Sequence, residues 1–242
     1  MSLEAVGREV HVEAGRSAEI REDTMDLAQF RATVGQDAPP DGLDLALQTL
    51  WWDAKGDWNH AHACAQQDEG QAGSAVHAYL HRKEGDMRNA AGWYARAGRQ
   101  PATVPLEQEW QSLAEEMMTH RAAQDARAAM DGFMAAFNAR DAEAIRSRWF
   151  HFPHVRFHSG TVTVMQTPAE YGNLVWDSQT QSRGWDRSAW DTVEVIDAGP
   201  EKVHFRVQFT RYRADGSVIG NYRSLYIVTL RDGRWAIQGR SS

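Results

Sequence analysis

The stretch Val203-His204-Phe205-Arg206-Val207-Gln208-Phe209-Thr210 decides the fold of this chain. Its apolar residues fall on one face of an extended strand and its polar residues on the other. That alternation predicts a half-buried β-strand. Downstream, Asp215-Gly216 and Asp232-Gly233 are hairpin signals, and the segment between them, 218–230, is long enough for a bent strand. We therefore predict a strand meander that ends on Trp235-Ala236-Ile237.

Helical patterns precede this meander. An apolar face repeats at helical spacing through 122–139, and a short helix over 142–148 follows the capping residue Asp141. The period then changes to two in Val155–His158 and in Thr161–Met165, before Thr167-Pro168 begins another helix. Helices followed by a meander predict an α+β domain shaped as a cone, with a pocket inside.

The first half of the chain differs in composition. Residues 1–40 are polar and acidic, which predicts a flexible tail. Residues 41–118 predict a small helical domain, with a proline-rich linker at 100–106, and residues 119–242 form the second domain. Gly56-Asp57 and Gly85-Asp86, 29 residues apart, each predict a helix end followed by an N-cap.

Bulk composition excludes several classes of protein. Residues 1–118 hold 10 Lys and Arg against 20 Asp and Glu, an acidic balance that repels nucleic acid. The single cysteine, Cys64, cannot form an internal disulfide, and no apolar run is long enough to span a bilayer. We expect a cytoplasmic protein that binds neither nucleic acid nor membrane. No phosphate loop, dinucleotide-binding glycine motif or nucleophile elbow is present, so no cofactor is expected.

Two resemblances to known families follow from these motifs. The segment Gly85–Gly98, with small alanines beside Trp93 and Tyr94, resembles the second helix of tetratricopeptide or Sel1-like repeats. Such a resemblance implies a protein-interaction domain at 41–100. The segments 136–141, 152–156, 167–171 and 232–235 resemble, in order, the SnoaL-like branch of the nuclear-transport-factor-2-like superfamily. That resemblance implies helices wrapped by a strongly curved, mostly antiparallel sheet, a pocket at its open end, and a homodimer formed through the sheet.

The same superfamily includes isomerases and cyclases whose acidic base commonly sits on the strand after the second helix. Here residues 149–166 contain no Asp or Glu, and Phe157 stands near the position of that base. Histidine is the candidate replacement: His154, Arg156 and His158 share one strand face, where two imidazoles and an oxyanion-stabilising arginine could act together. The alternation favours an outward orientation for this row, because Val155 and Phe157 are the residues that favour burial.

Aromatic side chains are the candidates for lining the pocket, although ordinary core packing explains them as well. They are Trp149, Phe157, Tyr171, Trp176 and Trp190. In the helical half, the pairs His60/Cys64 and His77/His81 have the i,i+4 spacing of metal ligands. Chance placement among ten histidines explains those pairs, so we expect no metal.

Two functions remain open from the sequence. The first is a dimerising module that binds a small apolar or aromatic ligand, or regulates, and is coupled to a helical protein-interaction domain. The second is a SnoaL-like cyclase, isomerase or dehydratase with a histidine base. The missing carboxylate favours the first.

Overall fold

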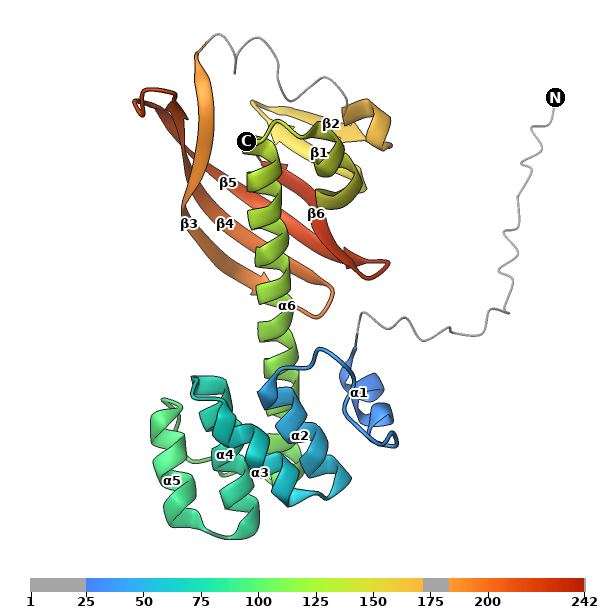
Figure 1. Cartoon of the computed structure of the whole chain (residues 1–242), viewed down its shortest axis with the longest axis vertical. Helices are drawn as coiled ribbons and strands as arrows, with labels where there is room; N and C mark the ends of the chain where they lie inside the picture. Colours follow the sequence, from blue (N-terminus) through green and yellow to red (C-terminus); the bar gives the residue numbers. More distant parts are fainter. Residues whose placement is uncertain (1–24, 172–182, 242) are drawn as a thin grey trace, which may run out of the picture.

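The computed structural model describes residues 25–171 and 183–241 (Figure 1). Helices occupy the first half and one curved sheet occupies the second, so the predicted α+β class is confirmed. The helices are α1 (Leu27–Thr33), α2 (Leu45–Lys55), α3 (Trp58–Gln67), α4 (Gln71–Glu84), α5 (Met87–Arg96), α6 (Leu106–Asn138) and α7 (Ala142–Ala144). A π-helical turn at 145–149 leads into the sheet, and a 3-10 turn at 168–171 follows its first hairpin.

The helical domain is held by its corners and by a compact core. Gly56 and Gly85 adopt left-handed backbone conformations at φ 85° and 95°, and Asp57 and Asp86 cap the following helices, so the predicted Gly-Asp corners are confirmed. Helix α1 lies within the stretch expected to be a tail. It is packed into the domain by Phe30, which is fully buried and stacks on Trp110. Residues 1–24 of that expected tail lie outside the described residues.

Helix α6 connects the two halves without a break. Its 33 residues span about 50 Å. The first part buries Trp110, Leu113 and Met117 in the helical domain, and the last part buries Met130 and Phe133 beneath the sheet. The helix therefore belongs to both cores, which places the two domains end to end (Figure 1).

The sheet has six strands in the order β2-β1-β6-β5-β4-β3. Their bounds are β1 (Phe150–His158), β2 (Thr161–Met165), β3 (Trp185–Ala198), β4 (Lys202–Arg213), β5 (Val218–Arg231) and β6 (Arg234–Ser241). All neighbours are antiparallel except β1 and β6. Both predicted hairpins are confirmed, with Gly216 and Gly233 at positive φ.

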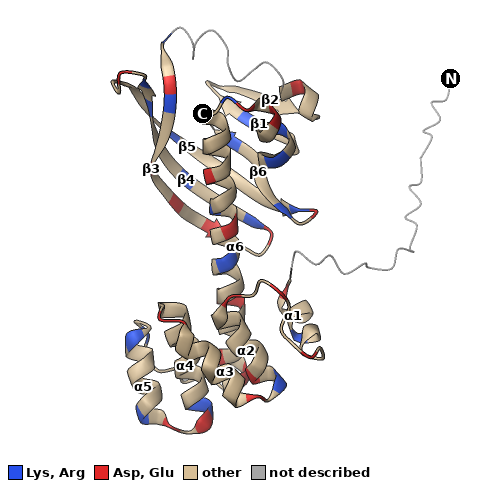
Figure 2. Ribbon diagram, viewed as in Figure 1, with Lys and Arg blue, Asp and Glu red and all other residues tan. Residues whose placement is uncertain are grey.

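The concave face of the sheet wraps around the C-terminal part of α6 and forms the second core. Lys and Arg residues are scattered over several strands rather than gathered in one stripe (Figure 2). No helix in residues 25–171 and 183–241 is long and apolar enough to cross a membrane.

Candidate functional site

Strand register determines which side chains face the interior of the cone. Tyr226 of β5 lies opposite Phe205 of β4 and Arg240 of β6, and Arg240 lies opposite Arg156 of β1. Residues opposite each other on neighbouring strands share one face of a sheet. Phe205 and Tyr226 are buried against α6, so Arg240 and Arg156 lie on the inner face with them.

A second arginine enters the interior from β4. Arg211 continues the inward alternation of Phe205, Val207 and Phe209, and its guanidinium lies 4.6 Å from the ring centroid of Tyr222. The guanidinium of Arg240 lies 5.5 Å from the ring of Phe133 and 5.4 Å from that of Phe150. Cations are stabilised over aromatic faces, so the rings offset part of the cost of burying both charges.

Arg211 and Arg240 line the same narrow cavity, together with Phe133, Met134, Phe137, Ser188, Phe209 and Tyr226. Its volume is about 20 Å³, room for roughly one water-sized group. The Nε atoms of both arginines are buried and lack a hydrogen-bond partner, and neither side chain forms an ion pair within the described residues. Burial lowers the pKa of Arg211, and the neighbouring Arg240 lowers it further. The interior is therefore positively charged and lined by aromatic rings.

His154 lies beside this cavity as a neutral imidazole. Its side chain is fully buried and stacks on Phe150 with ring centroids 3.8 Å apart. Nδ1 lies 3.1 Å from the carbonyl oxygen of Ile237; because a carbonyl only accepts, Nδ1 carries the proton and Nε2 keeps its lone pair. Burial, aided by the charge of Arg240, lowers the pKa of His154 to about 3.

Two aromatic hydrogen-bonding groups complete the interior. Tyr171 is 1% exposed and meets Phe150 edge-on at 4.9 Å; burial raises its pKa to about 12, although Arg240 opposes the shift. Trp190 meets Tyr226 edge-on at 5.7 Å, and its buried Nε1 has no hydrogen-bond partner among the described residues. Both groups are neutral at physiological pH.

Comparison with known proteins identifies the domain that holds this site. Residues 123–240 match the family described as NTF2-like protein (DUF6841). The C-terminal domain is an NTF2-like domain. No protein of curated function matches the chain. The likeness to the SnoaL-like branch, and that of the helical domain to tetratricopeptide repeats, stay predictions.

Similar solved structures carry related names. An NTF2-like protein with a cystatin-like fold from Novosphingobium aromaticivorans is 15% identical; the match covers 53% of this chain and 85% of that one, with a TM-score of 0.43. A ketosteroid isomerase-like protein from Erwinia carotovora atroseptica is 18% identical over 49% of this chain and 92% of its own, with a TM-score of 0.38. A protein of unknown function from Nostoc punctiforme is 10% identical over 49% and 87%, with a TM-score of 0.42.

The predicted outward orientation of the row His154, Arg156, His158 is wrong within the NTF2-like domain. His154 is inside the cone, whereas Phe157 is 49% exposed on the opposite face. The reason is the position of β1 next to the edge strand β2, where no helix of the described residues covers the outer face and buries Phe157. His158 lies exposed at the end of the strand beside Ser159, so the row does not act as one site.

The predicted aromatic pocket is divided in the same way. Tyr171 and Trp190 lie in the interior, and Phe157 does not. Trp149 packs on the backbone of α6 at Gly132, where an added Cβ would lie 2.3 Å from its ring. Trp176 lies outside the described residues.

Arg211 and Arg240 were missed by the sequence analysis. Arg211 was detectable, because it continues the period of the strand that begins at Val203. Arg240 was not, because the register of β5 against β6 shifts between Ile227 and Val228, and sequence does not locate that irregularity.

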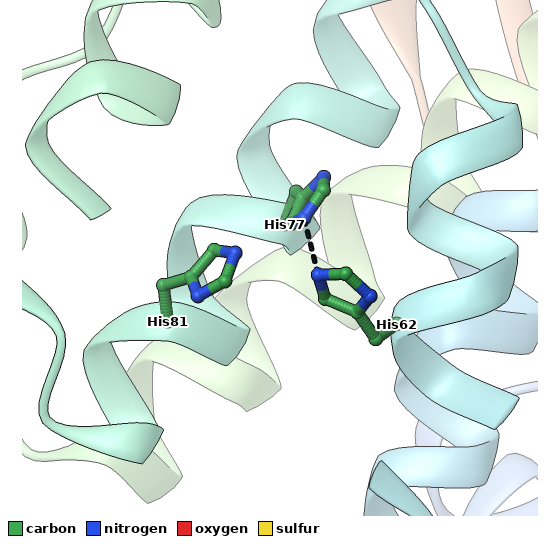
Figure 3. Close-up of side chains that lie close together, drawn as sticks. All are labelled: His62, His77 and His81. Carbon is green, nitrogen blue, oxygen red and sulfur yellow. Dashed lines mark hydrogen bonds between the residues drawn. The ribbon is translucent and has the colours of Figure 1, made fainter. Parts of the chain in front are cut away.

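The predicted metal-ligand pairs separate in the structure. His60 is exposed on α3, stacks on Trp52 and pairs with Asp57. The residue of α3 that meets His77 and His81 is His62 instead (Figure 3). Cys64 is half-buried on the same helix and is not part of that group.

Proposed function

We propose that the NTF2-like domain binds a small monoanionic ligand with a flat apolar body, and that Arg211 and Arg240 hold its anionic group. One observation carries this proposal: two half-buried arginines, each with a buried Nε atom that lacks a hydrogen-bond partner, face a single cavity, and neither pairs with a carboxylate in the described residues. A buried charge without a partner costs several kcal/mol. A bound carboxylate would pair both cations through charge-assisted hydrogen bonds.

The surroundings favour an aromatic body for the ligand. Phe133, Phe209, Tyr226 and Trp190 present ring faces and edges next to the arginines. The cavity itself holds roughly one water-sized group, so the anionic group needs a movement of the lining side chains, and the apolar body must displace aromatic side chains. Tyr171 and Trp190 supply hydrogen-bond donors for polar atoms on that body.

The geometry supports binding better than catalysis. The enzyme alternative has one supporting observation, the Nε2 lone pair of His154 inside the cone. With a pKa of about 3, however, that imidazole is a weak base at neutral pH and gives little driving force for proton abstraction. Residues 149–166 contain no carboxylate that could act as the base in place of His154.

Calorimetric titration of the full-length protein with benzoate tests the proposal. We expect one site per chain, with binding weakened about 10- to 100-fold in Arg211→Gln and in Arg240→Gln. Arg206→Gln is the matched control, because Arg206 lies on the same strand as Arg211 but is exposed and pairs with Glu194. Equal loss in the control, or no binding of benzoate, acetate or formate to the wild type, would overturn the proposal.

We also propose that the outer face of the sheet carries the homodimer contact. Register places Val155 and Ile227 on either side of Gly239. On the other side of β1, Val155 lies next to Val164 of β2, and Phe157 lies next to Val162. The result is one apolar patch across four strands, most of it exposed. Its members are Val155, Phe157, Val162, Val164, Leu225 and Ile227.

Light scattering on a sizing column tests the dimer. We expect a dimer for the wild type and a monomer for Leu225→Lys, since a lysine in the patch must lose its hydration on association. Val218→Lys is the control, because Val218 is 51% exposed on the same strand but lies by the β4–β5 turn. A monomeric wild type would contradict this contact. The protein partner expected for the helical domain stays a prediction.

A further inference from the structure

Three histidines from two helices meet in the helical domain, outside the NTF2-like domain. His62 comes from α3, and His77 and His81 lie one turn apart on α4 (Figure 3). The Nε2 atoms of His62 and His77 are 3.0 Å apart, and one ring nitrogen from each of the three residues lies within 4.8 Å of the others. The cluster is called the triad below.

The rings of the triad are fixed by packing. Trp93 of α5 stacks on His77 at 3.8 Å, and Trp58 stacks on His62 at 4.5 Å. His77 and His81 are almost completely buried, whereas His62 is partly exposed and opens the triad to solvent. Three stacked imidazoles in one place are a preorganised donor set rather than a mobile surface cluster.

The surroundings also set the protonation of the rings. His81 Nδ1 lies 3.0 Å from the Glu84 carboxylate and donates its proton there, so the lone pair of this ring is on Nε2, where the Asn89 side-chain amide lies 3.1 Å away and a metal ion would have to displace it. Burial lowers the pKa of His62 and lowers that of His77 to about 4, and neighbouring triad members add to both shifts. Among the described residues, the one hydrogen bond that joins two members of the triad is the bond between His62 and His77.

We propose that His62, His77 and His81 bind one divalent transition-metal ion of the zinc class, with a solvent molecule in the fourth position. Zinc–nitrogen bonds of about 2.0–2.1 Å place tetrahedral ligand atoms roughly 3.4 Å apart, so the triad needs only a small closure. Three imidazole ligands favour zinc, cobalt, nickel or copper over magnesium or calcium. The Glu84 carboxylate behind His81 is the outer partner that such ligands commonly have.

Metal binding at this place would join α3 to α4. These helices are consecutive, and α5 closes the triad through Trp93 and through Asn89, whose side-chain amide lies 3.1 Å from His81 Nε2. The ion would therefore fix the packing of three helices in a small domain, where metal binding contributes directly to folding. This inference is independent of the ligand proposed for the cone.

Cobalt titration of untagged, chelator-stripped full-length protein tests the proposal, with absorption in the visible range as the readout. We expect one Co²⁺ per chain, displaced by Zn²⁺. The variant His62→Gln should weaken binding by at least about 100-fold, and Glu84→Gln by about 10-fold. His60→Gln is the matched control, two residues away on the same helix but outside the triad.

A second readout separates metal loss from misfolding. Zinc at about 100 times its dissociation constant should raise the unfolding temperature of the wild type and of His60→Gln by roughly 5–15 °C. It should raise the unfolding temperature of His62→Gln by no more than about 2 °C, while circular dichroism shows the same helix content in all three. No cobalt binding to the wild type, or equal loss in His60→Gln, would overturn the metal site.

Discussion

Replacing His154 by Phe should destabilise the folded protein at pH 7 and stabilise it at pH 5, relative to the wild type. The phenyl ring keeps the stack on Phe150 but loses the hydrogen bond from Nδ1 to the Ile237 carbonyl. A lost neutral hydrogen bond costs about 1 kcal/mol, so the variant should be less stable than the wild type at pH 7 by about that amount.

The change with pH follows from the pKa of His154. The folded protein lowers that pKa from 6.5 to about 3, so below pH 6.5 the unfolded chain binds a proton that the folded chain does not. The stability contributed by the neutral ring is complete above pH 6.5 and is lost as the pH falls toward 3. At 1.36 kcal/mol per pKa unit, the wild type loses about 2 kcal/mol from this residue by pH 5, and the variant loses none of it.

Urea unfolding at pH 7, 6 and 5, followed by tryptophan fluorescence and circular dichroism, measures both proteins. His77 and His151 also have lowered pKa values, but their contribution cancels in the difference between variant and wild type. We expect the variant to be less stable at pH 7 and more stable, by about 1 kcal/mol, at pH 5. A difference that does not change with pH would refute the buried, neutral state of His154.

Four further substitutions test three other parts of the structure by thermal or urea unfolding. Gly132→Ala should cost about 1–3 kcal/mol because its Cβ would lie 2.3 Å from the Trp149 ring, whereas Gly92→Ala, with nothing within 4 Å, should stabilise its helix by about 0.5–1 kcal/mol; equal effects would contradict the packing. Asp53→Ala removes the shared acceptor of a buried tyrosine and a lysine, and should cost about 2–3 kcal/mol; a loss below about 0.5 kcal/mol would speak against that network. Arg211→Met should abolish anion binding yet raise the stability of the ligand-free protein by about 1 kcal/mol, and a large loss of stability would show that the charge is satisfied.

The strands and corners of the fold were predictable because local chemistry determines them. The alternation of 203–210, the two Asp-Gly hairpins and the Gly-Asp corners each depend on a few adjacent residues. The unbroken helix α6 was only partly predictable. The apolar face over 122–139 predicted a helix there, but sequence does not reveal that the same helix begins at Leu106 and supplies both cores.

The candidate site was less predictable, since it depends on which face of each strand is covered. At β1 the polar residue His154 is inside and the apolar Phe157 is outside, because tertiary cover at the edge of the sheet overrides the local pattern. Arg240 enters the interior only through an irregular register. The triad was missed for a similar reason. The packing of α3 against α4 determines which histidine of α3 faces His77 and His81, and that residue is His62, not His60.

The central claim is that Arg211 and Arg240 form one anion site inside the NTF2-like domain, and a bromide-soaked crystal tests it most directly. Anomalous scattering locates the ion without any assumption about the natural ligand, and a single-atom anion requires less widening of the cavity of about 20 Å³ than a carboxylate does. We expect a bromide in that cavity, in contact with both guanidinium groups, and its loss in crystals of Arg240→Gln. A cavity without bromide, with both guanidinium groups paired to carboxylates of the protein itself, would contradict the account.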